Sequence, residues 1–442
     1  MGRRYLLTLA LSLALGCEIQ RTPFHCGDHA SCGEGGYCEA EGTCSFPDPA
    51  CPMTARRHGE LSPPDLARSC VETCATAVYA GGNTTCAARA GGSVVCWGAN
   101  DSAQLGTGGG VIPAESAKPM VVSLANVGMT AVSIGGAHAC VSGGSMGRIA
   151  CWGDNRYGQV GLPRAQGDLI PVPTVVIEGT SACAGARHTC ALRADGRVAC
   201  WGDGALKQLG SPLSVASSDT PLTVETAEGP LEGVESIACG AEFTCARTFG
   251  AVFCWGSAPT GGSSSWVAGP VALPESHVFA LVAGSHHACA VIGQGIYCWG
   301  DNQHGQLGRD PRSGAGAHWI PERIDTTLAV GGAITLIAGA HHTCARSEVG
   351  ELICFGDNSS GQLGLGEETS MSWRPVLVPG LPRVESMAAG LAHTCALTPE
   401  RRVYCFGDNA RGQLGDGTAI TRRSVGLPSG VTCPGQGPGF IR

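Results

Sequence analysis

The sequence predicts an all-β protein: a seven-bladed β-propeller of four-stranded antiparallel blades, preceded by a small disulfide-rich N-terminal segment. Three observations lead to this prediction. A similar stretch recurs seven times, each copy holds two cysteines around a short turn, and the repeat shows no helical periodicity. A single four-stranded sheet cannot bury both faces, whereas seven sheets arranged radially can, and they leave only short edges.

The repeating unit is clearest over Ala184–Gly210, where two cysteines flank a short run and Trp-Gly follows the second. The first cysteines of successive copies lie 54, 50, 55, 44, 55 and 51 residues apart. The seven pairs are Cys86 with Cys96, Cys140 with Cys151, Cys190 with Cys200, Cys245 with Cys254, Cys289 with Cys298, Cys344 with Cys354, and Cys395 with Cys405. The aromatic residues after the second cysteines are Trp97, Trp152, Trp201, Trp255, Trp299, Phe355 and Phe406.

Each pair is predicted to be a disulfide across a β-hairpin. The enclosed residues divide into two short strands and a turn, which places the cysteines opposite each other on antiparallel strands. Where the turn has three residues, its last residue needs a left-handed conformation, and Gly92, Gly196 and Gly350 suit this position. Arg401 fits it less well. The alternative is seven pairs of buried free thiols.

The rest of the repeat supplies the remaining strands. A stretch such as Gly300–Gly308 predicts a turn followed by a short apolar strand. A Pro-containing apolar run such as Arg374–Pro379 and a strand such as Val384–Ala389 lead into the next repeat. Repeat four replaces the turn with Ser257–Gly269, which predicts a degenerate blade with a flexible loop.

The motif Ala-Gly-x-x-His-(Thr/Ala)-Cys-Ala, followed by Cys-Trp-Gly-Asp-Asn and Gly-Gln-Leu-Gly, resembles the regulator-of-chromosome-condensation repeat. The resemblance covers residues 75–433 and implies a seven-bladed propeller. It also implies a protein that binds partners through blade loops, since nucleotide-exchange factors, enzyme regulators and a β-lactamase inhibitor share the repeat. The cysteine pairs depart from the eukaryotic pattern and suggest an exported bacterial branch.

The first residues predict export. Arg3 and Arg4 precede an apolar run over Tyr5–Leu15 that is too short to span a bilayer, so residues 1–16 are interpreted as a signal peptide. The run ends in Ala-Leu-Gly-Cys, which resembles a lipobox and makes Cys17 the lipid-bearing residue. The protein is then expected in the cell envelope as an outer-membrane or surface lipoprotein. Ordinary cleavage, with Cys17 as a plain thiol and a secreted product, is the alternative.

Residues 17–25 are expected to form a tether, 26–51 a cysteine-rich mini-domain, 52–74 a linker, 75–433 the propeller and 434–442 a tail. The mini-domain has too few apolar residues for a core, so disulfides must hold it. Zinc is the less favoured alternative, because the spacing lacks CxxC pairs. Two bridges of unassigned connectivity are expected among Cys26, Cys32, Cys38 and Cys44.

Three further disulfides are expected outside the hairpins. Cys51 and Cys70 would close a local loop, and a bond between Cys74 and Cys433 would lock the first blade to the last. Cys183 and Cys239 lie just before the hairpins of repeats three and four and would bridge adjacent inner strands. These assignments pair every cysteine except Cys17. Twenty-five cysteines also indicate an oxidising compartment.

No cofactor or metal is expected. Histidines that recur two residues before the first hairpin cysteine are interpreted as structural, with hydrogen bonds inside each blade: His138, His188, His287, His342 and His393. Thr84 and Phe243 take this position in repeats one and four. A metal ring is the alternative. The Asp-Asn pairs are interpreted as turn caps rather than calcium ligands, because the spacing of a calcium loop is missing.

The leading functional hypothesis is a non-enzymatic, monomeric propeller that binds a protein or glycan at the cell surface. A net charge of −8 argues against nucleic acid, and no catalytic motif is present. Trp266, Trp319 and Trp373 are expected in long inter-blade loops, either as binding anchors or with their rings packed over neighbouring blades. The alternatives are a propeller enzyme, such as a polysaccharide lyase or hydrolase, and a purely architectural envelope protein. The enzyme would need acidic or histidine groups converging at the channel mouth.

Overall fold

The computed structural model describes residues 75–426, except 91, 109–112, 125–128, 144–146, 214, 258–264, 275–276, 294, 313–317 and 326–334, and three short strands before them. The chain divides into two compact units, Met1–Val71 and Glu72–Arg442. The first contains a three-stranded antiparallel sheet, in the order β1 (Tyr37–Cys38), β2 (Cys44–Pro47) and β3 (Arg56–His58). The predictions for Cys17, Cys26, Cys32, Cys51, Cys70, Cys74 and Cys433 lie outside the described residues.

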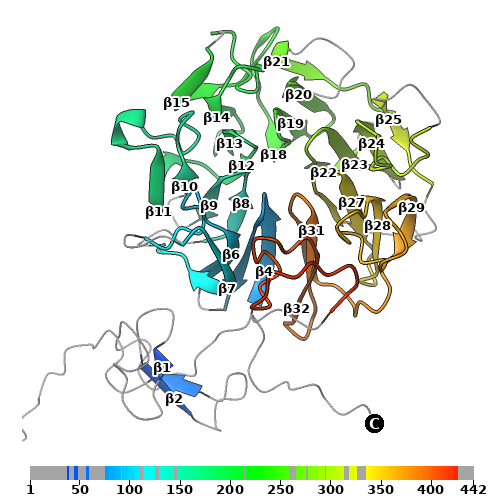
Figure 1. Ribbon diagram of the computed structural model, residues 1–442. Helices are drawn as coiled ribbons and strands as arrows, with labels where there is room; N and C mark the ends of the chain where they lie inside the picture. The colour runs from blue at the N-terminus through cyan, green and yellow to red at the C-terminus, as the bar shows by residue number, and fades with distance from the viewer. Residues whose placement is uncertain are drawn as a thin grey trace, which may run out of the picture. The chain divides into compact units, whose positions relative to one another are not determined.

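The second unit is a seven-bladed propeller, as predicted (Figure 1). Each blade is an antiparallel sheet whose strands follow one another in sequence order from the central channel to the rim. Blades 1 to 3 comprise β4 (Ala75–Gly81), β5 (Thr84–Arg89), β6 (Val94–Ala99) and β7 (Glu115–Val121); β8 (Ala131–Ile134), β9 (His138–Gly143), β10 (Arg148–Asp154) and β11 (Leu169–Glu178); and β12 (Ser181–Ala184), β13 (His188–Leu192), β14 (Val198–Asp203) and β15 (Ser217–Thr223). Blades 4 and 5 comprise β18 (Val234–Cys239), β19 (Phe243–Thr248), β20 (Val252–Gly256) and β21 (Ser265–Pro270); and β22 (Val278–Ala283), β23 (His287–Ile292), β24 (Gly295–Gly300) and β25 (His318–Arg323). Blades 6 and 7 comprise β26 (Thr335–Ala338), β27 (His342–Arg346), β28 (Leu352–Asp357) and β29 (Met371–Leu377); and β30 (Ser386–Ala389), β31 (His393–Leu397) and β32 (Val403–Gly407).

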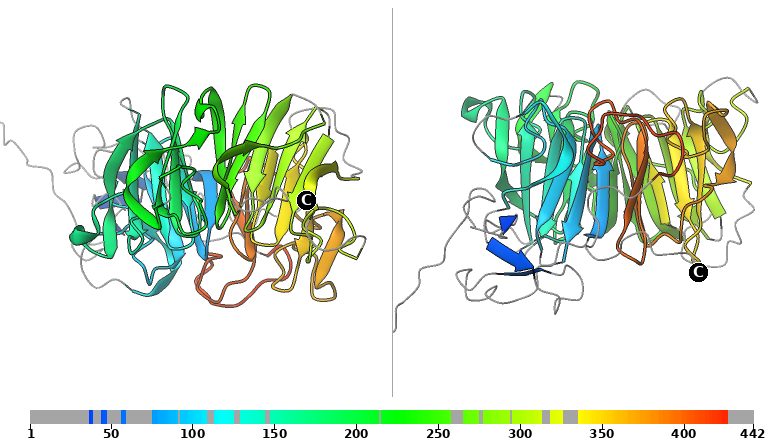
Figure 2. Two further views of the ribbon diagram at one scale, coloured as in Figure 1. Left: turned by 90° about the horizontal axis from the view of Figure 1, so that it is seen from above. Right: turned by 60° about the horizontal axis from the view of Figure 1, so that its bottom comes forward.

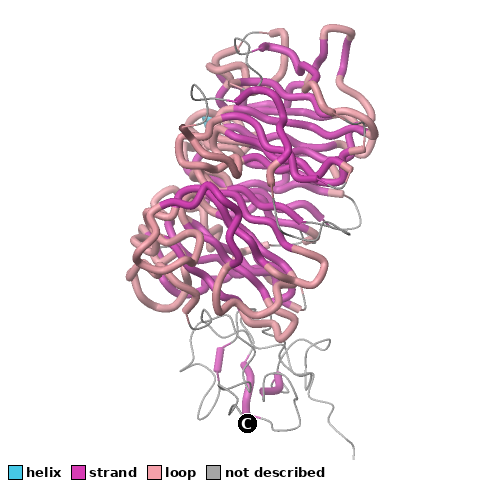
Figure 3. Tube along the Cα trace, turned by 90° about the vertical axis from the view of Figure 1, so that its right-hand side faces the viewer, coloured by secondary structure: helices cyan, strands magenta, loops and turns pink. Residues whose placement is uncertain are grey.

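Among the described residues, little regular structure lies outside the blades. A two-stranded hairpin, β16 (Glu225–Thr226) and β17 (Gly229–Pro230), precedes blade 4. A 3₁₀ turn spans Arg164–Gln166 (Figure 3). Within the described ranges, no helix has the length and apolar character needed to cross a membrane.

The ring closes without exchanging a strand between blades 7 and 1. Blade 7 has three strands, and Arg422 pairs with Gly407 at the place of a fourth. Blade 7 meets blade 1 through backbone hydrogen bonds from Leu391 N to Gly82 O (2.8 Å) and from Gly417 N to Ala117 O (3.0 Å). The strands of neighbouring blades stand side by side around the ring (Figure 2). Among the described residues, blades 7 and 1 are thus joined by these hydrogen bonds and by packing of their sides.

Each hairpin contains the predicted disulfide, so the alternative of free thiols is wrong for these pairs. The two cysteines of every pair lie directly opposite each other, with Cα atoms 4.0–4.2 Å apart. The bonds join Cys86 to Cys96, Cys140 to Cys151, Cys190 to Cys200, Cys245 to Cys254, Cys289 to Cys298, Cys344 to Cys354, and Cys395 to Cys405.

The hairpin turns have the predicted backbone conformation. Gly92, Gly196 and Gly350 adopt φ of 76° to 85°. Arg401 adopts φ of 60°, which is uncommon for a residue with a side chain. The left-handed conformation therefore persists even where the turn lacks glycine.

The stretch after each Asp-Asn pair corrects one expectation. Gln306-Leu307-Gly308 is part of a turn and not a short strand, because Asn302 Oδ1 accepts the backbone N–H of Leu307 at 3.0 Å. Gly305 and Gly308 both have φ of 75°. The Pro-containing run that follows is the outer strand.

The hydrophobic core is divided among the blade boundaries. Seven clusters of buried residues each join two adjacent blades. Their largest members are the fully buried aromatic rings that follow the second cysteines. At six of the seven boundaries the last glycine of the preceding turn leaves room for the ring: a Cβ on Gly106 would lie 2.6 Å from Trp152 Nε1. The repeat motif therefore encodes contacts between blades.

Candidate functional site

The inner strands of the seven blades enclose a central cavity of about 440 Å³. Its lining consists mainly of glycine, alanine and aliphatic residues from the ends of β4, β8, β12, β18, β22, β26 and β30. Among the described residues, no Asp, Glu, His, Lys or Arg belongs to this lining. Its titratable group is Tyr79, since the two lining cysteines are bonded, and burial raises the pKa of Tyr79. The described channel wall thus lacks the converging acidic or histidine groups that the enzyme hypothesis requires.

The recurring histidines are fully buried and hydrogen-bond across blade boundaries, so the expectation of partners within the same blade was wrong. Each Nε2 contacts the hydroxyl of a threonine on the next blade at 2.8–3.0 Å. The pairs are His138–Thr189, His188–Thr244, His287–Thr343, His342–Thr394 and His393–Thr85. The ring lies over the glycine of its own motif: a Cβ on Gly339 would be 2.1 Å from His342 Cε1.

The hydrogen-bond network fixes the tautomer of these rings. At four boundaries the threonine hydroxyl donates to a glutamine carbonyl of the preceding blade, as Thr394 Oγ1 does to Gln362 O at 2.8 Å. The imidazole Nε2–H must then be the donor to the threonine. Each Nδ1 is buried and has no hydrogen-bond partner among the described residues. Burial accordingly lowers the pKa to about 4 for His138 and His393, and to about 3 for His188, His287 and His342.

Where the histidine is absent, its partner is absent too. Phe243 of blade 4 is fully buried in a cluster with Ala288 of blade 5. Thr84 of blade 1 bonds to Ala99 O of its own blade, and Ala139 takes the threonine position in blade 2. A buried imidazole N–H without an acceptor is costly, which explains the paired replacement.

The Asp-Asn pairs act as turn caps. Asp301 accepts hydrogen bonds from Gln303 N (3.1 Å) and Gln306 Nε2 (2.9 Å). The equivalent Asp357 and Asp408 make the same kinds of bond. Their side chains are therefore engaged in holding the turns.

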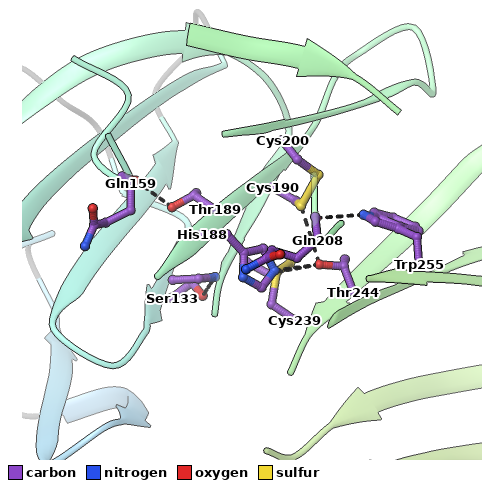
Figure 4. Close-up of a disulfide and its surroundings, with 12 residues drawn as sticks. Ser133, Gln159, His188, Thr189, Cys190, Cys200, Gln208, Cys239, Thr244 and Trp255 are labelled. Atoms are coloured by element: carbon purple, nitrogen blue, oxygen red, sulfur yellow. Dashed lines mark hydrogen bonds between the residues drawn. A yellow bond between two sulfur atoms is a disulfide. The ribbon is translucent and has the colours of Figure 1, made fainter. Parts of the chain in front are cut away.

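Cys183 and Cys239 form a disulfide that joins β12 to β18 and lines the channel. Figure 4 shows Cys239 near His188, Thr244 and the bond between Cys190 and Cys200. Ligand atoms of His188, Cys190 and Cys239 lie within 4.8 Å of one another. However, Cys190 is bonded to Cys200 and Cys239 to Cys183, so neither sulfur is a free thiolate. Thr244 Oγ1 fills the space between them, 3.5 Å from Cys190 Sγ and 3.6 Å from Cys239 Sγ. In this state the group is a junction between blades 3 and 4.

The three candidate tryptophans lie on outer strands and not in loops, which corrects their predicted location. Trp266, Trp319 and Trp373 belong to β21, β25 and β29 of three consecutive blades. In each blade, the glycine of the Trp-Gly or Phe-Gly step pairs with a residue of the outer strand, and the tryptophan is the next residue of that strand. The three tryptophan positions are therefore equivalent. The side chain of Trp266 is outside the described part of the structure.

Trp319 and Trp373 differ in exposure. Trp319 is 44% exposed beside Ile320 at 67%. Trp373 is half-buried, packs over Gly305 of the preceding blade and has the Arg374 guanidinium 4.7 Å from its ring centre. We call Trp266, Trp319, Ile320 and Trp373 the aromatic rim.

Sequence reasoning missed a second exposed apolar pair. Phe249, in the hairpin turn of blade 4, is 82% exposed, and Phe279 at the start of blade 5 is 66% exposed. Arg247 NH1 bonds to Val278 O at 3.0 Å and so links these two segments. An aromatic residue in a two-residue turn was the available signal for Phe249.

The fold defines a class: seven-bladed repeat propellers whose described hairpins are clamped by disulfides. Two family models, both described as Regulator of chromosome condensation (RCC1) repeat, match the chain. One matches residues 147–192, 195–247, 295–346 and 349–397, and the other matches 75–104, 180–208 and 384–413. Together they cover more than half of the sequence, so the chain belongs to the RCC1 repeat family.

Curated relatives share parts of the chain. Ultraviolet-B receptor UVR8 of Arabidopsis thaliana is 28% identical over 349 residues, covering 77% of this chain and 66% of UVR8. The E3 ubiquitin-protein ligase HERC2 of Homo sapiens is 29% identical over 76% of this chain, which spans only 7% of HERC2. Human Regulator of chromosome condensation is 31% identical over 33% of this chain and 34% of its own length.

Solved structures share the fold. Prp20p from Saccharomyces cerevisiae superposes with a TM-score of 0.66 at 20% identity, covering 81% of this chain and 87% of Prp20p. Human WBSCR16 gives 0.66 at 18% identity, covering 76% and 94% of the two chains. At these identities the likeness describes the architecture.

Proposed function

We propose that this protein is a protein-binding scaffold of the cell envelope and that its partner docks on the aromatic rim of blades 4 to 6. The observation that carries the proposal is the recurrence of tryptophan at one equivalent position on three consecutive outer strands. Tryptophan and arginine dominate the binding energy of protein interfaces. The Arg374–Trp373 stack and the exposed Trp319 and Ile320 have this character.

Two further findings support a binding role. The described channel lining supplies no acid, base or metal ligand beyond Tyr79 and a disulfide. Yeast Prp20p is described as binding Gsp1p and histones, and another solved structure holds yeast RCC1 (Prp20) with Kap60. Those partners belong to Prp20p, but they support protein binding as the use of this architecture. A glycan that stacks on the indole faces is the second candidate ligand.

The test is capture from envelope extract by the purified, oxidised protein, quantified by mass spectrometry. Trp319→Ala should remove the captured partner. Leu169→Ala is the matched control, because Leu169 is also 44% exposed and lies on the outer strand of blade 2. Equal capture by the wild type and both variants would contradict the proposal. Digesting the extract with a protease or a glycosidase separates a protein partner from a glycan.

The envelope location rests on the lipobox-like Ala-Leu-Gly-Cys17 and on the disulfides, which need an oxidising compartment. Cys17→Ala should release the protein from the membrane fraction. Retention of the variant would show that no lipid at Cys17 holds it. Glu18 leaves the choice between inner and outer membrane open.

A further inference from the structure

Two histidines outside the buried ring lie together at the boundary of blades 5 and 6. His304 lies in the turn after β24 and His341 in the turn after β26, and their ring centres are 4.6 Å apart with an interplanar angle of 34°. His286, in the turn after β22, is exposed. Burial is the main cause of the lowered pKa of His341, the neighbouring His304 adds to it, and His286 contributes least. None of these side chains belongs to the aromatic rim.

The boundary of blades 2 and 3 carries different side chains at the equivalent positions. Tyr157 occupies the place of His304, two residues after the Asn of the turn motif, and Arg187 precedes His188 as His341 precedes His342. The Arg187 guanidinium lies 4.8 Å from the centre of the Tyr157 ring and 3.0 Å from Asp203. The position therefore holds a cation between a ring and a carboxylate.

The boundary of blades 5 and 6 has aspartates equivalent to those of blades 2 and 3, but it has a histidine in place of Arg187. Asp301 and Asp357 form no ion pair with any lysine or arginine of the described segments. Their side-chain hydrogen bonds come from neutral donors, Gln306 Nε2 at 2.9 Å and Gln362 Nε2 at 2.8 Å. The site thus holds two carboxylates without a lysine or arginine partner among the described residues, and both act electrostatically on His341.

The His341 ring is in the form that ligates metals. Its Nδ1 is buried and has no hydrogen-bond partner among the described residues. Burial, and then the neighbouring His304, lower the pKa of His341, which leaves the imidazole neutral at pH 7. A neutral imidazole presents a free lone pair.

We propose that His304 and His341 form a binding site for one divalent transition-metal ion that bridges blades 5 and 6. Imidazole ligands select zinc, nickel or copper over magnesium and calcium. The charge of the ion would take the place of the missing guanidinium in the field of Asp301 and Asp357. The two rings lie in contact across the boundary, with their centres 4.6 Å apart. This proposal is independent of the aromatic rim.

Zinc titration of the full oxidised chain by calorimetry at pH 7.5 tests the site, after a thiol assay has shown that no free cysteine can bind the ion. We expect one zinc ion whose Kd rises at least about tenfold in His304→Ala and His341→Ala, since even outer-shell changes at metal sites cost 10–100-fold. His277→Ala is the matched control, because His277 is exposed at the opposite end of blade 5.

His341→Arg guards against misfolding, because it recreates the arrangement of Arg187. This variant should unfold at the wild-type temperature without zinc and lose the zinc-dependent rise in Tm. Lowering the pH to 5.5 should also weaken binding, because protonated imidazoles cannot ligate the ion. Two results would overturn the proposal. One is zinc uptake that is equal in the wild type, His304→Ala and His341→Arg. The other is no uptake at about 1 mM zinc, a concentration at which even a very weak site would bind.

Discussion

Two neighbouring boundaries of the ring are joined in different ways. Between blades 3 and 4, His188 bonds to Thr244 at 2.8 Å, Trp255 Nε1 donates to Gln208 O at 3.0 Å, and the bond between Cys183 and Cys239 adds a covalent link. Between blades 4 and 5, Phe243 packs in a cluster with Ala288. There, Trp299 Nε1 has no acceptor among the described residues.

The contrast shows that the boundary, and not the blade, is the unit in which polar groups are satisfied. A histidine on one blade occurs only with a threonine on the next, and the boundary of blades 4 and 5 has neither. A boundary with both the histidine and the threonine is stable, and so is a boundary with two apolar residues. A boundary with the histidine alone would leave a buried N–H donor unpaired. Three predictions test this contrast.

Acid should affect the two kinds of boundary most differently. An unfolded histidine titrates near pH 6.5, whereas the five buried rings have a pKa of about 3 to 4. The unfolded chain therefore binds more protons below pH 6.5, and the free energy of unfolding falls as the pH falls toward 4. Each ring contributes about 1.4 kcal/mol per pH unit, or about 7 kcal/mol for five.

Denaturant unfolding at pH 7.5, 6.5 and 5.5 measures this slope. The double variant His342→Phe/Thr394→Ala copies the apolar boundary and should reduce the total loss of unfolding free energy between pH 7.5 and 5.5 by about 1.4 kcal/mol, because the unfolded histidine becomes mostly protonated only below pH 6.5. Identical slopes for the variant and the wild type would show that His342 is not buried as a neutral ring.

Replacing only the threonine of a His–Thr pair should lower the free energy of unfolding more, relative to what is removed, than replacing both residues. Thr394→Ala leaves the His342 N–H without its acceptor and should cost about 1–3 kcal/mol of unfolding free energy. The double variant with His342→Phe should cost less than the sum of the two single changes. Denaturant titration of all four proteins gives the coupling energy, and strict additivity would argue against paired replacement.

The smallest effect is expected from the indole N–H groups. Trp255→Phe breaks the bond to Gln208 O, whereas Trp299→Phe removes a donor with no described acceptor. Both lose similar volume, so Trp255→Phe should be less stable than Trp299→Phe by about 1 kcal/mol in denaturant unfolding. A larger loss at Trp299 would point to an acceptor for its indole.

Much of the fold could be predicted from the sequence because turn length and cysteine spacing constrain each hairpin locally. The position of Gly92 or Gly196 fixes the turn, and the turn fixes which residues face each other. The bridge between Cys183 and Cys239 could also be predicted, since both residues precede the hairpins at similar points.

Contacts between blades were harder to predict. The acceptor of His138 lies 51 residues away, and only the ring geometry shows that it belongs to the next blade. The loop location of Trp319 was wrong because the outer strand pairs across a β-bulge, which disguises its alternation. The cluster of His304 and His341 depends on two turns from different blades, although the doublet His341-His342 hinted that one histidine was spare.

The spacing of the bonded cysteines also sets an order of oxidation. The seven hairpin disulfides join residues only 9–11 positions apart, so each pair can meet as soon as one hairpin has formed. Cys183 and Cys239 are separated by 56 positions and face each other only after two finished sheets have docked. Among the described disulfides, the bond between Cys183 and Cys239 is therefore expected to form last. Its formation indicates that two blades have packed against each other.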